Sequence, residues 1–261
     1  MLGKLLKYEI PAMGRKLGPL YAAWAATALF LGLTAQAAES KSEFMVVISA
    51  LLYTAIATAI LVMTIIMIVQ RYSNSLLGDE AYFNHVLPVS VAEHIGNKAI
   101  SATIWVFVTI LVAILTGLLI AIGAVIVGGI EGFDIRDFFY ELFHMDLDLP
   151  KHFGLYVIEV LILTVTGIVK TIMQIYAAIT IGHQVQNRTT LASIGAYILI
   201  MIFESSVGRA LLPLFINLEY APDGFVNFNR VFIPGFILAV IFSAIYFFIC
   251  KYLMENRLNL A

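Results

Sequence analysis

The sequence predicts an all-α integral membrane protein with six transmembrane helices. Of its 261 residues, 61% are apolar and only 12% are charged, whereas about 25% of the residues in a soluble domain are charged. Six apolar stretches reach the roughly 20 residues that a spanning helix needs. The short alternating segments typical of a membrane β-barrel are absent. This composition excludes a soluble, disordered or fibrous chain, and the net charge of −2 gives no basis for nucleic-acid binding.

The candidate spans form a single transmembrane domain over residues 1–261 and lie at 17–36, 45–69, 99–127, 153–181, 191–216 and 232–250. If the N-terminus is cytoplasmic, the inside segments carry 9 basic and 5 acidic residues, and the outside segments carry 4 basic and 10 acidic ones. Lys and Arg concentrate in cytoplasmic loops. Both termini are therefore expected on the cytoplasmic side.

The N-terminal segment 1–16 alternates leucines with charged residues, which predicts an amphipathic helix in the membrane interface. Pro11 is expected to end or kink that helix. Ala35-Gln36-Ala37 resembles a signal-peptide cleavage site, but the apolar run before it is longer than the 7–15 residues of a signal peptide. We therefore expect the first span to be retained.

The connection between the second and third spans predicts a short helix at 76–86. Asp79 and Glu80 suit its first turn, where carboxylates meet free backbone amides, and Pro88 ends it. It carries more large apolar side chains than a solvated loop requires: Leu76, Leu77, Tyr82 and Phe83. These side chains need either the lipid interface or a protein partner.

Three further patterns define the remaining connections. Ser90 and Glu93 form a capping box that starts the helix of the third span. Apolar spacing in the acidic outer segment predicts a helix at 134–145, lying on the membrane, capping the exit of a pathway or packed on the protein's own spans. Residues 222–224 read Pro-Asp-Gly, a turn signal, in the outer connection 217–231 between the last two spans.

Four charged residues lie inside spans: Glu159 and Lys170 in the fourth, Glu204 and Arg209 in the fifth. Such groups are costly in a bilayer and indicate function by default. In an antiparallel hairpin Lys170 and Glu204 lie at similar depth and are expected to pair, and Glu159 and Arg209 form a looser second pair nearer the outer face. Structural pairing, lining of a polar pathway and proton relay are all compatible with this pattern.

Motifs for catalysis are missing from the chain. It has no phosphate-binding loop, no dinucleotide fingerprint, no H-E-x-x-H zinc motif and no G-x-S-x-G nucleophile motif. The five histidines are scattered, and the single cysteine excludes an internal disulfide. We therefore expect no enzyme activity, no cofactor and no metal in this chain.

Several short motifs resemble those of the permease subunits of ABC-2 type transporters from Gram-positive bacteria. They are Leu5-Leu6-Lys7-Tyr8-Glu9, Gln70-Arg71-Tyr72, Leu76-Leu77-Gly78-Asp79-Glu80-Ala81-Tyr82, Leu87-Pro88-Val89-Ser90 and Asn256-Arg257-Leu258-Asn259-Leu260. The resemblance implies a multi-pass protein of the bacterial plasma membrane. It also implies that a separate ATPase, in two copies, binds ATP and Mg²⁺, and that a second permease copy or a sister permease completes the pathway.

The same resemblance implies roles for individual residues. The helix 76–86 would be the coupling helix that contacts the ATPase through Leu77, Gly78, Asp79, Glu80, Tyr82 and Phe83. Together with the charges inside the spans, the resemblance makes these residues candidates for lining the translocation pathway: Thr54, Thr58, Thr64, Glu159, Lys170, Glu204 and Arg209.

The substrate implied by the resemblance is a peptide, because family members of this size export bacteriocins, lantibiotics or amphipathic toxins such as phenol-soluble modulins. An alternative within the class is a lipid-linked or small-molecule antibiotic. Two other classes stay open: an ion-coupled secondary transporter that uses the intramembrane charges, and an immunity or sensor protein that only binds a peptide. Against the ion-coupled transporter, the sequence lacks an inverted repeat.

Overall fold

The computed structural model describes residues 2–35, 43–78, 89–128, 153–185, 188–216 and 224–256. These residues form six helices and contain no strand: α1 (Leu2–Ala35), α2 (Glu43–Leu76), α4 (Val91–Gly128), α6 (Phe153–Gly182), α7 (Thr189–Ile216) and α8 (Gly224–Asn256). Each helix contains a segment that is long and apolar enough to cross a membrane. The chain is therefore a multi-pass membrane protein, and the predicted class is confirmed.

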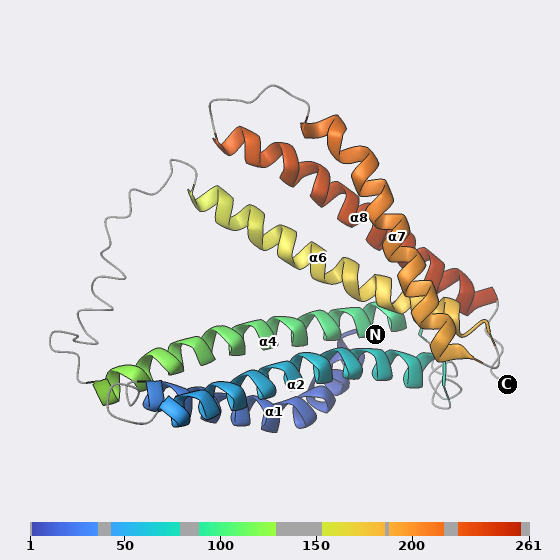
Figure 1. The fold of residues 1–261 in the computed structure, drawn as a ribbon. Helices are drawn as coiled ribbons and strands as arrows, with labels where there is room; N and C mark the ends of the chain where they lie inside the picture. Colours follow the sequence, from blue (N-terminus) through green and yellow to red (C-terminus); the bar gives the residue numbers. More distant parts are fainter. Residues whose placement is uncertain are drawn as a thin grey trace. The chain divides into compact units, whose positions relative to one another are not determined.

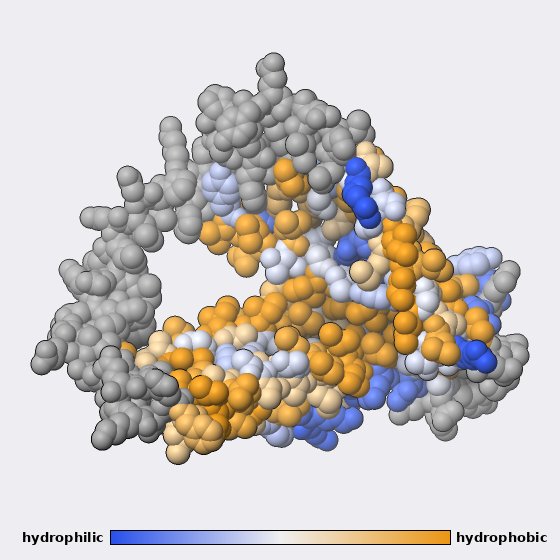
Figure 2. Space-filling view, in the orientation of Figure 1, coloured by the Kyte–Doolittle hydropathy of each residue, from blue (hydrophilic) through white to orange (hydrophobic). Residues whose placement is uncertain are grey.

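Exposed apolar side chains cover much of the described surface. Apolar residues dominate the visible faces of the helices in Figure 2, and Leu199 and Phe203 on α7 are 68% and 61% exposed. A soluble protein rarely exposes apolar area on this scale, whereas lipid accommodates it without cost. The interior is accordingly small, and polar groups carry much of the specific packing.

The sequence predicts a separate amphipathic helix for the N-terminal segment, but the structure shows none there. Residues 2–16 are part of α1, which continues through Pro11 and Pro19 to Ala35. Proline removes one backbone hydrogen bond, but spanning helices tolerate that loss when neighbouring groups compensate for it. With 34 residues and a rise of about 1.5 Å each, α1 is about 51 Å long, which exceeds the roughly 30 Å hydrocarbon core.

Other helix boundaries also differ from the sequence expectation. Leu76 is the last residue of α2 and not the start of a new helix. The helix α8 begins at Gly224, inside the predicted turn and before the predicted span start at 232. The capping box is confirmed, because Ser90 Oγ accepts a hydrogen bond from the Glu93 amide at 3.3 Å and the Ser90 amide donates to Glu93 Oε2 at 3.2 Å. The predicted outer helix 134–145 lies outside the described residues.

The described helices group into two compact units. The first unit contains residues 1–9, 68–103 and 150–261, and the second contains residues 10–67 and 104–149. Three helices, α1, α2 and α4, therefore contribute to both units, while α6, α7 and α8 belong to the first unit alone. The single domain expected from the sequence stays a prediction.

Close backbone contact holds the second unit together. A Cβ placed on Gly123 of α4 would lie 2.9 Å from the Gly32 Cα of α1, and a Cβ on Gly32 would collide with the Ile120 carbonyl oxygen. Hydroxyl pairs link all three helices of this unit: Tyr21 of α1 to Thr109 of α4 at 2.7 Å, Thr34 of α1 to Ser49 of α2 at 2.7 Å, and Tyr53 of α2 to Thr116 of α4 at 3.1 Å. Small residues and hydroxyl pairs are the usual means of packing helices in lipid.

In the first unit, α6 lies beside both α7 and α8 (Figure 1). The end of α6 meets the start of α7, since a Cβ on Gly182 would lie only 2.5 Å from the Ser193 amide nitrogen. Only glycine permits this approach without a backbone shift. The predicted hairpin of the fourth and fifth spans is thereby confirmed, and it determines which side chains of the two helices meet.

Candidate functional site

An ion pair joins α6 to α7 inside their spanning segments. The Lys170 ammonium group of α6 donates a hydrogen bond to the Glu204 carboxylate of α7. The two side chains are 22% and 18% exposed, so the pair lies at the edge of the helix contact. The pairing predicted from matched depth is confirmed.

Two further polar groups lie in the same three-helix region. The Tyr246 hydroxyl of α8 is near the Glu204 carboxylate. Gln174 lies one turn after Lys170 on α6 and is 3% exposed, and its amide nitrogen has no hydrogen-bond partner among the described residues. An unpaired buried amide costs free energy, so the region has hydrogen-bonding capacity that the described chain leaves unused.

The second predicted pair, between Glu159 and Arg209, is not formed. Arg209 is exposed and donates to the Ser205 side chain and carbonyl of its own helix, at 3.0 and 3.3 Å. The physical reason is direction around the helix, because residues five apart point about 140° away from each other. Since Glu204 faces α6, Arg209 cannot. One carboxylate oxygen of Glu159 is buried without a hydrogen-bond partner in the described part of the chain.

The three predicted pathway threonines of α2 do not share one face. Thr54 and Thr58 are exposed one turn apart, and each donates to a carbonyl oxygen of its own helix. Thr64 is buried, 5% exposed, and bonds to the Ile60 carbonyl at 2.8 Å. These threonines belong to the second unit, whereas the charged candidates belong to the first. The structure thus brings together Lys170 with Glu204, and Thr54 with Thr58.

Of the predicted ATPase contacts, the structure describes only the first two. Leu77 is buried, 9% exposed, and its amide donates to the Ser73 carbonyl at 2.9 Å. Gly78 packs on the backbone of Asn74. Leu77 therefore extends the last turn of α2 into the protein interior. The other four predicted contacts, Asp79, Glu80, Tyr82 and Phe83, lie outside the described residues.

A second charged site lies in the first unit where α1 begins, α2 ends and α4 begins. The Glu9 carboxylate accepts from Arg71 Nη1 at 2.8 Å and from Lys98 Nζ at 2.9 Å. Glu9 and Lys98 are 13% and 9% exposed. Arg71 also donates to the Glu9 carbonyl oxygen at 3.3 Å. We call these three residues the Glu9 bridge.

Aromatic stacking lies beside the Glu9 bridge. The rings of Tyr72 on α2 and Tyr176 on α6 stack with centroids 3.9 Å apart and planes 8° apart. The Tyr176 hydroxyl donates to the Lys98 carbonyl at 3.2 Å, and the Tyr72 hydroxyl is 2.8 Å from Thr180 Oγ1. Two buried sulfur atoms of α8 complete the cluster: Met254 is 3.8 Å from the Tyr72 hydroxyl, and Cys250 is 3.8 Å from Thr180. The cluster thus links α2 and α4 to α6 and α8.

The Glu9 bridge was not predicted from the sequence. By sequence alone, Glu9 belongs to the polar face of an amphipathic helix, and Arg71 and Lys98 belong to the basic flanks of spans. A signal was present, because Glu9 is the one acidic residue among four basic ones in 1–16. A carboxylate in an otherwise basic flank indicates a specific partner.

One histidine lies close to this cluster. His183 follows the last residue of α6, and its Nε2 is 3.3 Å from the Ser73 hydroxyl. Partial burial lowers the pKa of His183 below its usual value, because a charged imidazole loses hydration there. The neutral ring is therefore favoured at physiological pH.

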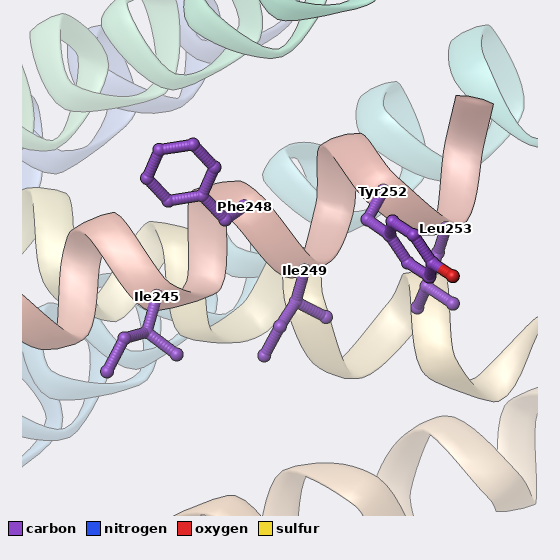
Figure 3. Close-up of a pocket in the computed structure, with 5 residues that line it drawn as sticks. All are labelled: Ile245, Phe248, Ile249, Tyr252 and Leu253. Carbon is purple, nitrogen blue, oxygen red and sulfur yellow. The ribbon is translucent and has the colours of Figure 1, made fainter. Parts of the chain in front are cut away.

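An apolar groove runs along α8 and has a volume of about 460 Å³. Figure 3 shows its five lining side chains, which all project from α8: Ile245, Phe248, Ile249, Tyr252 and Leu253. None of these five described lining residues is charged. Its chemistry suits a lipid chain or another apolar helix better than a polar ligand.

No group of histidine, cysteine or acidic residues suited to a metal ion occurs among the described residues. Comparisons of the chain with protein families, with curated proteins and with solved structures find no match.

Proposed function

We propose that this chain is the membrane subunit of an ATP-driven exporter of the ABC-2 type in the bacterial plasma membrane. It would provide the translocation pathway for an amphipathic peptide, as a homodimer or with a sister permease. Two copies of a separate ATPase would bind ATP and Mg²⁺. The chain itself would be no enzyme, and both its termini would be cytoplasmic.

The observation that carries this proposal is the Lys170–Glu204 pair within six predominantly apolar spanning helices. A pathway for an amphipathic peptide needs a mostly apolar lining with a few polar groups that replace lost hydration. The pair, the nearby Tyr246 and the unused Gln174 amide supply such groups. The sequence motifs around 70–90 support the ATP-driven class, because their family places a coupling helix there.

A second candidate function is ion-coupled transport. It is favoured by the buried Glu159 carboxylate oxygen without a hydrogen-bond partner among the described residues. A carboxylate oxygen in a span without a hydrogen-bond partner is suited to accept one from a protonated group or to contact a cation. This function would require no ATPase.

The test is ATP hydrolysis by this chain co-purified with an ATPase encoded beside it. Variants Glu80→Lys and Tyr82→Ala are compared with wild type, with and without an amphipathic helical peptide. Glu255→Lys is the matched control, because Glu255 is an exposed carboxylate at the end of α8. We expect a stable complex, a peptide-dependent rate and loss of that dependence in the two loop variants alone.

The same experiment can also refute the exporter proposal. If no ATPase co-purifies and the loop variants behave as wild type, the exporter proposal is wrong. Peptide or ion uptake driven by a proton gradient in liposomes, lost in Glu159→Gln, would then establish the ion-coupled function.

A further inference from the structure

The Glu9 bridge occupies a particular place in the chain. Arg71 lies five residues before Leu76, where α2 ends, and Lys98 lies seven residues after Val91, where α4 begins. The bridge therefore joins the two helix ends that flank the connection 77–90. Glu9 adds α1 as the third helix of the bridge.

The same three helices continue from the first unit into the second. The chain passes between the units at residues 9 and 10, 67 and 68, and 103 and 104. Each member of the Glu9 bridge lies within five residues of one of these points, on the first unit's side. The bridge is thus an ionic link among these three helices, close to the points where each passes from one unit to the other.

One carboxylate group binds both cationic partners, so the loss of Glu9 would remove both ion pairs at once. Its two oxygens are divided between the partners, since Arg71 binds Oε1 and Lys98 binds Oε2. Because Glu9 and Lys98 are largely buried, removing the carboxylate would take an ion-pair partner from Lys98 in a poorly hydrated place, which is costly. The stacked rings of Tyr72 and Tyr176 next to the bridge join α2 to α6.

We propose that Glu9 is a positioning residue for coupling: it fixes the spacing of the α2 and α4 ends and makes α1, α2 and α4 move together. This inference builds on the proposed exporter function. In that function the ATPase displaces the connection 77–90. The bridge would pass that displacement to three spanning helices at once. Without the bridge, ATP hydrolysis would proceed without transport.

The first experiment measures peptide molecules transported per ATP hydrolysed by the reconstituted complex in liposomes. Glu9→Gln removes the charge at nearly constant shape, and the exchange Glu9→Arg with Arg71→Glu restores opposite charges between positions 9 and 71 but not between positions 9 and 98. Glu255→Gln is the control, because it removes an exposed pair with Lys251 at 4.0 Å. We expect Glu9→Gln to lower the ratio at least five-fold at unchanged ATPase binding, the exchange to recover part of it, and the control to leave it unchanged.

The second experiment needs no ATPase. Spin labels at Asn74→Cys and Val89→Cys report the distance between the two helix ends in the full chain. Glu9→Gln should broaden this distance distribution, while Glu255→Gln should not. A merely stabilising role for Glu9 would lower the melting temperature without changing the transport ratio.

An unchanged ratio or an unchanged distance distribution in Glu9→Gln would overturn the proposal. If Glu9→Gln fails to fold, the charge exchange takes its place, and a folded exchange variant with a wild-type ratio supports the bridge. Failure of the exporter function is distinguishable, because wild-type chain would then bind no ATPase while the spin-label result still decides whether Glu9 holds the helix ends.

Discussion

The two compact units hold their helices together by different chemistry. In the second unit, α1 and α4 meet through the backbones of Gly32 and Gly123, and neutral hydroxyl pairs link α1 to α4 and α2 to α4. In the first unit the links between helices include charged pairs at Lys170–Glu204 and at Glu9 with Arg71 and Lys98. Neutral close packing has one good geometry, whereas charged pairs can break and form again. The first unit also contains a close neutral contact, where Gly182 meets Ser193, so its charged pairs are additional to close packing and do not replace it.

Charge reversal at the Lys170–Glu204 pair should give the largest effect. Lys170→Glu and Glu204→Lys each leave like charges in contact within the spans, which costs roughly 3 kcal/mol or more. The double reversal should restore most of the stability, since it exchanges the partners. Melting temperatures and monodisperse yield in detergent would measure this.

Lys251→Glu is the control for that series, because its pairing with Glu255 is exposed and spans 4.0 Å. Exposed pairs contribute about 0–1 kcal/mol. A double reversal no better than either single variant would show that Lys170 and Glu204 do not pair in the membrane.

A bulky side chain at the glycine contact of the second unit should have an intermediate effect. Gly32→Leu must displace the Ile120 carbonyl and the Gly123 backbone, and overpacking of this kind costs about 1–3 kcal/mol. Gly18→Leu on the same helix should be near neutral, because nothing lies within 4 Å of a Cβ there. Equal melting temperatures for the two variants would refute close α1–α4 packing.

The smallest effect should be a dependence on pH through His183. Its pKa is lowered in the folded chain, so the unfolded chain binds the proton more tightly. Stability is therefore full above the unfolded pKa of about 6.5 and falls as the pH drops below it. His183→Gln should remove that part of the acid-side loss, which melting temperatures between pH 5 and 8 would measure. A wild-type pH profile in the variant would contradict the assignment.

The sequence predicted the features that depend on local composition or on simple depth. Six spans follow from the length of the apolar runs, and the Ser90–Glu93 capping box follows from adjacent residues. The Lys170–Glu204 pair was predictable because a tight hairpin fixes depth on two neighbouring helices. Depth alone failed for Arg209, since it ignores the direction in which a side chain points.

Features that depend on contacts between helices that are not neighbours in a hairpin could not be predicted from composition or depth. Pro11 argued locally for a helix end, yet α1 continues through it, so the surrounding structure outweighs the local cost. Glu9, Arg71 and Lys98 are far apart in sequence, and each has an ordinary local explanation. Only the folding of three helix ends into one place makes them a single site.

The buried Cys250 has a practical consequence for chemistry with thiol reagents. It is the single cysteine in the chain, and its sulfur lies fully enclosed beside Thr180. Thiol reagents require an accessible thiolate, so we expect almost no reaction of these reagents with Cys250 in the native protein. Cysteines introduced elsewhere, such as those for the spin labels, can therefore be modified one at a time in the natural sequence, without first building a cysteine-free variant.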